Sequence, residues 1–397
     1  MVKFRTLCRS AIVIWIWNSF SALATVYESD GSAASVQGLH NAVLNGDTIT
    51  LPSGTFTWTT SISISKGITI KGAGVGRTIV KDDVQSGQLI HWSLAAGQNS
   101  RLTGIEFQDG GRVNYANAPN GIIHVDGSNT DGSTFRFDHN KCTNLNGGLV
   151  FDTVIGVIDH NTMDMTRATI YPYATRWNGQ DNGDGSWAAP TAFGSSQFLF
   201  IEDNIFTNSV GQTGITDAYA GARFVVRHNE IRDGMVLNHG TESTGRIRGS
   251  KEMEIYNNTF IGSNRNKFIG GSRSGVVLMH DNNVSGYWDG LTVFPLDNYR
   301  THFPFSPWGG ADGINPWDVN SPNVFFTGTA GSNSLGTTVT VSGANWTPNQ
   351  WVGYALQRTS DHCGSGTVNF SEITGNTSST ITSNWNDQVT EGRPITP

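Results

Sequence analysis

Six short segments, each ending in asparagine, decide the fold of this 397-residue chain. They read Phe135-Arg-Phe-Asp-His-Asn140, Val157-Ile-Asp-His-Asn161, Phe200-Ile-Glu-Asp-Asn204, Phe224-Val-Val-Arg-His-Asn229, Met253-Glu-Ile-Tyr-Asn-Asn258 and Val277-Leu-Met-His-Asp-Asn282. Their final asparagines are separated by 21, 43, 25, 29 and 24 positions. Repetition at this period is typical of a solenoid in which each repeat forms one coil. The interval of 43 then represents two coils, or one coil with a long insertion.

The repeated asparagine predicts a ladder at one corner of the solenoid. Each coil points alternate side chains inward and outward, and it buries its apolar side only when the next coil stacks on it. Stacking places like residues above one another. Asparagine tolerates the left-handed backbone conformation of a corner, and its side-chain amide can bond to the next one at a step of about 4.8 Å. The histidines that precede three of these asparagines, His139, His160 and His228, are then expected to be stacked coil residues and not ligands.

The segment before the repeat predicts a covered end of the solenoid. Residues 35–44 place Val36, Leu39 and Val43 at helical spacing, and a short amphipathic helix of this kind protects the apolar end of a terminal repeat. Two stretches of strands broken by turns follow, Asn45-Gly-Asp-Thr-Ile-Thr-Leu-Pro-Ser-Gly-Thr-Phe56 and Ile68-Thr-Ile-Lys-Gly-Ala-Gly74.

Together with the asparagine segments, these stretches resemble the pectate-lyase-like right-handed parallel β-helix proteins over residues 36–298. The resemblance implies an all-β fold, a right-handed parallel β-helix with an N-terminal capping helix. It is unspecific for function, because the superfamily includes lyases, hydrolases, esterases, epimerases and phage tailspikes.

Composition and charge exclude several other classes of protein. Only 14% of the residues are charged and 48 are glycine, so a disordered acidic chain and a coiled coil are both ruled out. The net charge of −7 has the wrong sign for a protein that binds a nucleic-acid backbone. The cysteines Cys8, Cys142 and Cys363 give neither a disulfide framework nor a metal-binding spacing.

The N-terminus predicts secretion. Lys3, Arg5 and Arg9 precede an apolar run over residues 11–20 and the sequence Ala22-Leu-Ala24, which matches the three regions of a signal peptide. We therefore expect a signal peptide over 1–24, a β-helix domain over 25–322, and a C-terminal β-rich segment over 323–397 that forms extra coils, a cap or a small module. We expect a secreted, monomeric protein that acts on a polysaccharide and has no membrane span.

The strongest candidate for a catalytic centre lies on three successive coils. It contains His239, Glu242, Arg246, Arg248 and Lys267, with Arg273, Trp288 and Asp289 following. Arg246 and Arg248 are two positions apart, so an extended chain would direct both to one face, where they could hold carboxylated sugars.

Lyases that share the resembled fold use Arg, Lys, His and often calcium to eliminate across a uronic acid. By that resemblance His239 or Lys267 is the base, Arg246 or Arg248 neutralises the carboxylate, and Glu242 is a metal ligand or a partner. Calcium is implied by the resemblance alone.

Two other interpretations of the same centre stay open. Glycosidases with this fold use pairs or trios of carboxylates, for which Asp217, Glu242 and Asp289 are the candidates. Alternatively, Glu242 and the two arginines form a salt-bridge set on a solvated sheet, and the protein is a non-catalytic glycan-binding solenoid.

Two loops supply aromatic candidates for substrate binding, because sugars stack their C–H faces on aromatic rings. The first, residues 171–187, contains Tyr173, Trp177 and Trp187, and its Asp181 and Asp184 are candidate calcium ligands. The second, residues 303–318, contains Trp308 and Trp317 and either folds along the groove or caps the end of the solenoid.

Overall fold

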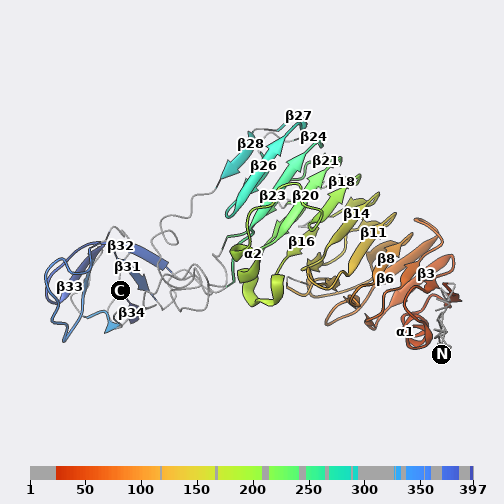
Figure 1. The fold of residues 1–397 in the computed structure, drawn as a ribbon, viewed down its shortest axis with the longest axis horizontal. Coiled ribbons are helices and arrows are strands. Elements are labelled where there is room, and N and C mark those ends of the chain that lie inside the picture. The colour runs from red at the N-terminus through yellow and green to blue at the C-terminus, as the bar shows by residue number, and fades with distance from the viewer. Residues whose placement is uncertain are drawn as a thin grey trace, which may run out of the picture.

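The protein folds as a right-handed parallel β-helix, as the sequence predicts (Figure 1). The computed structural model describes residues 24–396, apart from 117–118, 166–168, 208–213, 241–246, 264–267, 288, 294–325, 327, 332–336, 353, 359–368 and 384–393. Within these residues three parallel sheets run along the solenoid, and each coil contributes one strand to each sheet.

We call the three sheets A, B and C. Sheet A contains β1 (Val26–Glu28), β2 (Thr48–Thr50), β5 (Thr69–Lys71), β8 (Asn99–Thr103), β11 (Thr134–Asp138), β14 (Gly156–Asp159), β17 (Leu199–Glu202), β20 (Arg223–Arg227), β23 (Glu252–Tyr256) and β26 (Val276–His280). Sheet B contains β3 (Gly54–Trp58), β6 (Thr78–Asp82), β9 (Glu106–Asp109), β12 (Lys141–Thr143), β15 (Thr162–Asp164), β18 (Ile205–Thr207), β21 (Glu230–Arg232), β24 (Thr259–Ile261) and β27 (Asn283–Ser285). Sheet C contains β4 (Ile62–Ile64), β7 (Ile90–Ser93), β10 (Ile123–Asp126), β13 (Leu149–Asp152), β16 (Ile170–Tyr173), β19 (Thr216–Ala218), β22 (Val236–Asn238), β25 (Phe268–Ser272) and β28 (Asp289–Val293).

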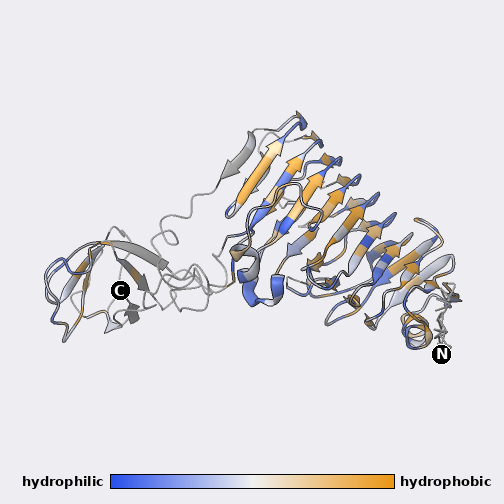
Figure 2. Ribbon diagram, in the orientation of Figure 1, coloured by the Kyte–Doolittle hydropathy of each residue, from blue (hydrophilic) through white to orange (hydrophobic). Residues whose placement is uncertain are grey.

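The interior of the solenoid is filled by the inward-facing residue of every second position. Figure 2 shows hydrophobic residues recurring on strand after strand along the solenoid. Phe137 stacks on Phe107 of the preceding coil, with ring centroids 6.4 Å apart. Coils approach so closely that a Cβ on Gly156 would lie 2.0 Å from the carbonyl oxygen of Phe135, so glycine is required there.

The asparagine ladder is confirmed by hydrogen bonds between successive coils. The Nδ2 of Asn161 donates to Oδ1 of Asn204 at 2.9 Å, and Asn204 donates in the same way to Asn229 at 3.0 Å. The ladder continues through Asn258 to Asn282. Because β14 pairs directly with β17, the interval of 43 is one coil with a long insertion.

The left-handed corner residue is the one before each asparagine, which corrects the expectation that the asparagine itself adopts this conformation. His139, His160 and His228 have φ values of 53°, 55° and 56°. This places the asparagine side chains inside the coil, where they are buried. The rings of His139 and His160 stack at 5.0 Å, as expected for coil residues.

The N-terminal helix α1 (Ala33–Ala42) is confirmed and packs against β4 and β2. Its first turn is capped by Ser32, whose side chain accepts a hydrogen bond from the amide of Ser35 at 3.1 Å. Val36 is fully buried on the face that covers the first coils. None of the helices in the described part of the chain is long and apolar enough to span a membrane.

The insertion between β16 and β17 forms η1 (Trp177–Gly179), η2 (Asp181–Gly183) and α2 (Asp184–Ala188). It is bound to later coils: the indole of Trp187 donates to the carbonyl of Gly249 at 2.8 Å, and the amide of Gly194 donates to Glu254 at 2.8 Å. The insertion is therefore an ordered segment that packs on the middle of the solenoid and is hydrogen-bonded to it.

The described residues of the C-terminal segment form a six-stranded sheet whose strands pair antiparallel, unlike the parallel strands of the coils. Its strands are β29 (Gly328–Thr329), β30 (Thr338–Thr340), β31 (Ala355–Arg358), β32 (Asn369–Asn376), β33 (Thr380–Ser383) and β34 (Pro394–Thr396). It has a separate hydrophobic core in which Trp346 and Trp351 contact edge to face at 6.2 Å.

Candidate active site

The outer face of sheet C carries a continuous set of polar and aromatic side chains. In β13, Leu149 and Phe151 enter the core, so Val150 and Asp152 face outward. The strand register then aligns the outward residues in two columns. The first contains His91, His124, Val150, Tyr171, Asp217 and Leu237. The second contains Asp126, Asp152 and Tyr173, and Tyr219, His239 and Arg273 extend it directly after the ends of β19, β22 and β25.

Three residues predicted from the sequence meet on this face, each on a different coil. The Nε2 of His239 lies 3.0 Å from Oδ2 of Asp217, and its Nδ1 lies 3.1 Å from a guanidinium nitrogen of Arg273. The side chains of His239 and Asp217 are 29% and 24% exposed. The group is therefore held in place by its partners while it stays open to solvent.

The partners of His239 determine where its proton lies. A guanidinium only donates hydrogen bonds, so Nδ1 must be the acceptor and Nε2 must carry the proton that is donated to Asp217. This is a neutral imidazole with its lone pair directed at Arg273. An orienting carboxylate on one nitrogen and a lone pair on the other are what a general base requires.

Tyrosine side chains line the outer face of sheet C on the coils that precede His239. Tyr219 contacts His239 edge to face at 5.9 Å, and Tyr173 contacts Tyr219 at 6.2 Å. The hydroxyl of Tyr171 lies 3.2 Å from that of Tyr115. Burial raises the pKa of both Tyr171 and Tyr173, and the charge of Asp217 adds to the effect, so both phenols stay protonated.

A second cluster on the same face, His124, Asp126 and Asp152, was missed by the sequence reasoning. Burial raises the pKa of Asp152 despite its hydrogen bonds from Thr175 and Thr153. Burial also acts to raise the pKa of Asp126, but its contacts with His124 and His91 outweigh it and hold that pKa below the ordinary value. The alternation of His124 and Asp126 is visible in the sequence, whereas its alignment with Asp152 depends on the register.

Arg248 does not face outward, contrary to the expectation for an extended chain. It lies outside the strands, and its side chain is buried with Nε 2.9 Å from Oδ1 of Asp184. Asp184 is therefore the partner of an arginine, which does not favour the predicted calcium site with the exposed Asp181. Arg248 is turned inward because the insertion packs Asp184 against the later loop that carries this arginine.

The aromatic residues of the insertion are more buried than a groove wall requires. Trp177 and Tyr173 are 7% and 9% exposed, and the guanidinium of Arg223 lies over the Trp177 ring at 5.3 Å. Trp187 is half-buried, with the Lys251 ammonium 5.0 Å from its ring centre. The rings of Trp177 and Trp187 mainly fix the insertion to the solenoid, whereas Tyr173 belongs to β16 itself.

Several predicted site residues lie outside the described residues, namely Glu242, Arg246, Lys267, Trp288, Trp308 and Trp317. The expected signal peptide lies there as well, up to residue 23. Asp289 begins β28, and its backbone pairs with Phe268, but its side chain is not among those described. The roles expected for these residues and for the signal peptide stay predictions from the sequence.

A separate cleft of about 610 Å³ lies on sheet A. Arg101, Arg136 and Arg227 line it, and each is paired with a carboxylate of its own sheet. Because these charges are already compensated, the cleft is a weaker candidate than the outer face of sheet C.

The fold and the site thus define a parallel β-helix protein with a polar, histidine-centred face on one sheet. No family model matches the chain, and no curated protein matches it. Among solved structures, an alginate lyase from Paenibacillus sp. str. FPU-7 aligns with 68% of this chain and 99% of its own length, at 14% identity and a TM-score of 0.40.

Two further solved structures are similar to this chain at comparable identity and TM-score. The PL6 family alginate lyase AlyGC aligns over 68% of this chain and 40% of its own, at 14% identity and a TM-score of 0.38. ORF18 of Geobacillus virus E2 aligns over 93% of this chain and 78% of its own, at 15% identity and a TM-score of 0.36.

Proposed function

We propose that the protein is a secreted enzyme that cleaves a uronate-containing polysaccharide by β-elimination on the outer face of sheet C. The observation that carries the proposal is the position of His239 between the carboxylate of Asp217 and the guanidinium of Arg273. The signal-like N-terminus supports the placement outside the cell.

β-Elimination requires a cation at the uronate carboxylate, a base for the C5 proton and an acid for the leaving oxygen. Arg273 supplies the cation, because a guanidinium binds a carboxylate through paired hydrogen bonds. When Arg273 turns to the substrate, Nδ1 of His239 is released to accept the C5 proton. Asp217 stabilises the imidazolium that forms.

The leaving oxygen takes its proton from a tyrosine in this proposal. Tyr219 is half-buried and its ring adjoins that of His239, so its hydroxyl belongs to the same face. The electrons of the broken C5–H bond form the double bond to C4 while the C4–O bond breaks, and the phenol protonates the departing oxygen. No water is consumed, which distinguishes the reaction from hydrolysis.

The test is incubation of the purified full chain with pectate, alginate, glucuronan and neutral glycans. Elimination gives an unsaturated product with a new ultraviolet absorbance, hydrolysis gives reducing ends without it, and a binding protein gives neither. Only the first outcome supports the proposal. The His239→Asn variant is then expected to lose about 10²-fold to 10⁴-fold in turnover.

The matched control is His139→Asn, which changes an exposed histidine at a coil corner where asparagine tolerates the positive φ. It should keep full activity. Equal activity in His239→Asn and the control would show that His239 is not the base.

A further inference from the structure

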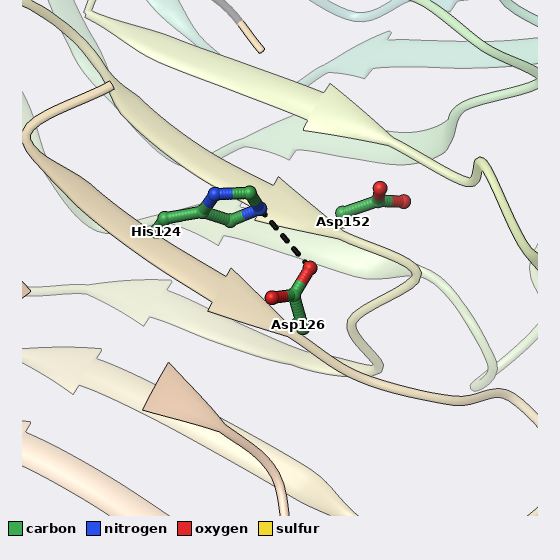
Figure 3. Close-up of side chains that lie close together, drawn as sticks. All are labelled: His124, Asp126 and Asp152. Carbon is green, nitrogen blue, oxygen red and sulfur yellow. Dashed lines mark ion pairs between the residues drawn. The ribbon is translucent and has the colours of Figure 1, made fainter. Parts of the chain in front are cut away.

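The cluster of His124, Asp126 and Asp152 is built from two neighbouring strands of sheet C (Figure 3). His124 and Asp126 are two positions apart on β10 and so share its outer face. Asp152 on β13 is the register partner of Asp126. One nitrogen or oxygen atom of each side chain lies within 4.8 Å of those of the other two.

Each carboxylate of the cluster has one oxygen held by a neighbour. Oδ2 of Asp126 lies 2.7 Å from Nε2 of His91. Oδ1 of Asp152 accepts hydrogen bonds from the amide of Thr175 at 2.8 Å and the hydroxyl of Thr153 at 2.9 Å. Outer contacts of this kind orient metal ligands, because they fix one oxygen and leave the other available for the ion.

His124 is the group that needs a partner. Its side chain is 13% exposed, and both ring nitrogens are buried without a hydrogen-bond partner among the described residues. Nε2 lies 3.0 Å from Oδ1 of Asp126, a contact that is an ion pair only when the ring is protonated (Figure 3). An unsatisfied buried nitrogen beside two carboxylates is the arrangement that a bound cation would complete.

We infer that His124, Asp126 and Asp152 bind a divalent transition-metal ion, with zinc or manganese as the matching class. An imidazole nitrogen with two carboxylates suits these ions, whereas calcium takes six to eight oxygen ligands. Metal–ligand bonds of about 2.0–2.2 Å place ligand atoms up to about 4.4 Å apart, so small side-chain rotations close the site.

The metal site is separate from the centre at His239. β16 lies between β13 and β19, so Asp152 and Asp217 are two strands apart on the same face, about 10 Å along the solenoid axis. Metal binding can therefore be measured without any knowledge of the substrate.

The experiment is calorimetric titration of the chelator-treated full chain with Zn²⁺, Mn²⁺ and Ca²⁺ in turn. We expect one equivalent of Zn²⁺ or Mn²⁺ to bind, and each of the variants His124→Gln and Asp152→Asn to weaken binding at least about 10-fold. The matched control, His160→Asn, removes a histidine that also contacts an aspartate, Asp159, at 2.7 Å, and it should bind the metal normally.

Three outcomes would overturn the inference: no binding of Zn²⁺ or Mn²⁺, a preference for Ca²⁺, or unchanged binding in both variants. Should the variants fail to fold, the wild-type protein loaded with Mn²⁺ still decides the question. Electron spin echo spectra must then show a histidine nitrogen coupled to the ion, and its absence refutes the site.

Discussion

The side chain of Asn161 donates a hydrogen bond to Oδ1 of Asn204 at 2.9 Å, although 43 positions separate the two residues. Nδ2 of Asn204 in turn donates to the carbonyl of Ile158 at 2.8 Å and to Oδ1 of Asn229 at 3.0 Å. The side-chain amide of Asn204 therefore connects three coils. The long insertion between Asn161 and Asn204 does not interrupt the ladder.

Replacing Asn204 with alanine should destabilise the protein by about 2–4 kcal/mol, because buried groups on both neighbouring coils lose their partners. Urea unfolding measures the change. The matched control is Asn282→Ala at the end of the ladder, where the asparagine is half-buried and has no following rung among the described residues. An equal loss at both positions would contradict a cooperative ladder.

Asp217→Asn should lower turnover on the cleaved polysaccharide by about 10²-fold or more. The new amide can donate to Nε2 of His239, which moves the imidazole proton to Nδ1 and removes the lone pair there. Initial rates at saturating substrate give the comparison. Asp109→Asn, an exposed change on sheet B, serves as the control and should leave the rate unaffected.

Arg248→Met should cost about 3–5 kcal/mol of stability, because it leaves Asp184 buried without its cation. Arg176→Met breaks an exposed pair with Asp181 at 3.3 Å in the same insertion and should cost about 1 kcal/mol or less. Denaturant unfolding of the two variants separates these values. Similar losses would mean that the Arg248 pair is not a buried structural contact.

Acid should remove the stabilisation that Asp138 provides. Burial acts to raise the pKa of Asp138, but hydrogen bonds from Arg101 and His139 outweigh it and hold that pKa below its ordinary value. The folded pKa is depressed, so this contribution is complete above the ordinary pKa of about 4 and is lost as the pH falls through the lower folded value.

The unfolding free energy of Asp138→Asn should therefore lie about 2 kcal/mol below that of the wild-type protein at neutral pH. The gap should shrink as the pH is lowered below about 4, because the unfolded chain binds a proton at this carboxyl there while the folded protein still holds it ionised. Unfolding curves across this range provide the measurement. A gap that stays constant with pH would show that the ionised form of Asp138 is not the stabilising one.

The coils were predictable because their signals are local. A β-branched run followed by asparagine specifies burial on alternate positions and a corner at the end of a strand, and both depend only on nearby residues. The same is true of α1, because the helical spacing of Val36, Leu39 and Val43 lies within one short stretch. The left-handed residue before each asparagine, a histidine in three of the six segments, belongs to the same local signal, although the sequence alone places this conformation on the asparagine.

The site was predictable only in part. Asp217, His239 and Arg273 were each chosen from the sequence, but their contact was not foreseen, since 22 and 34 positions separate them along the chain. Arg248 was assigned to an outward strand because the spacing from Arg246 suggested one, and tertiary packing against Asp184 turned it inward.

The sequence by itself determined that this chain stacks coils around an apolar interior with asparagine at one corner, because turn chemistry and alternation are properties of short segments. Tertiary structure decided which outward side chains meet, such as Asp126 with Asp152 and Asp217 with His239. The physical reason is that lateral alignment depends on the lengths of the loops between corners. Each loop shifts a strand relative to the next, and only the stacked sheets fix the register that results.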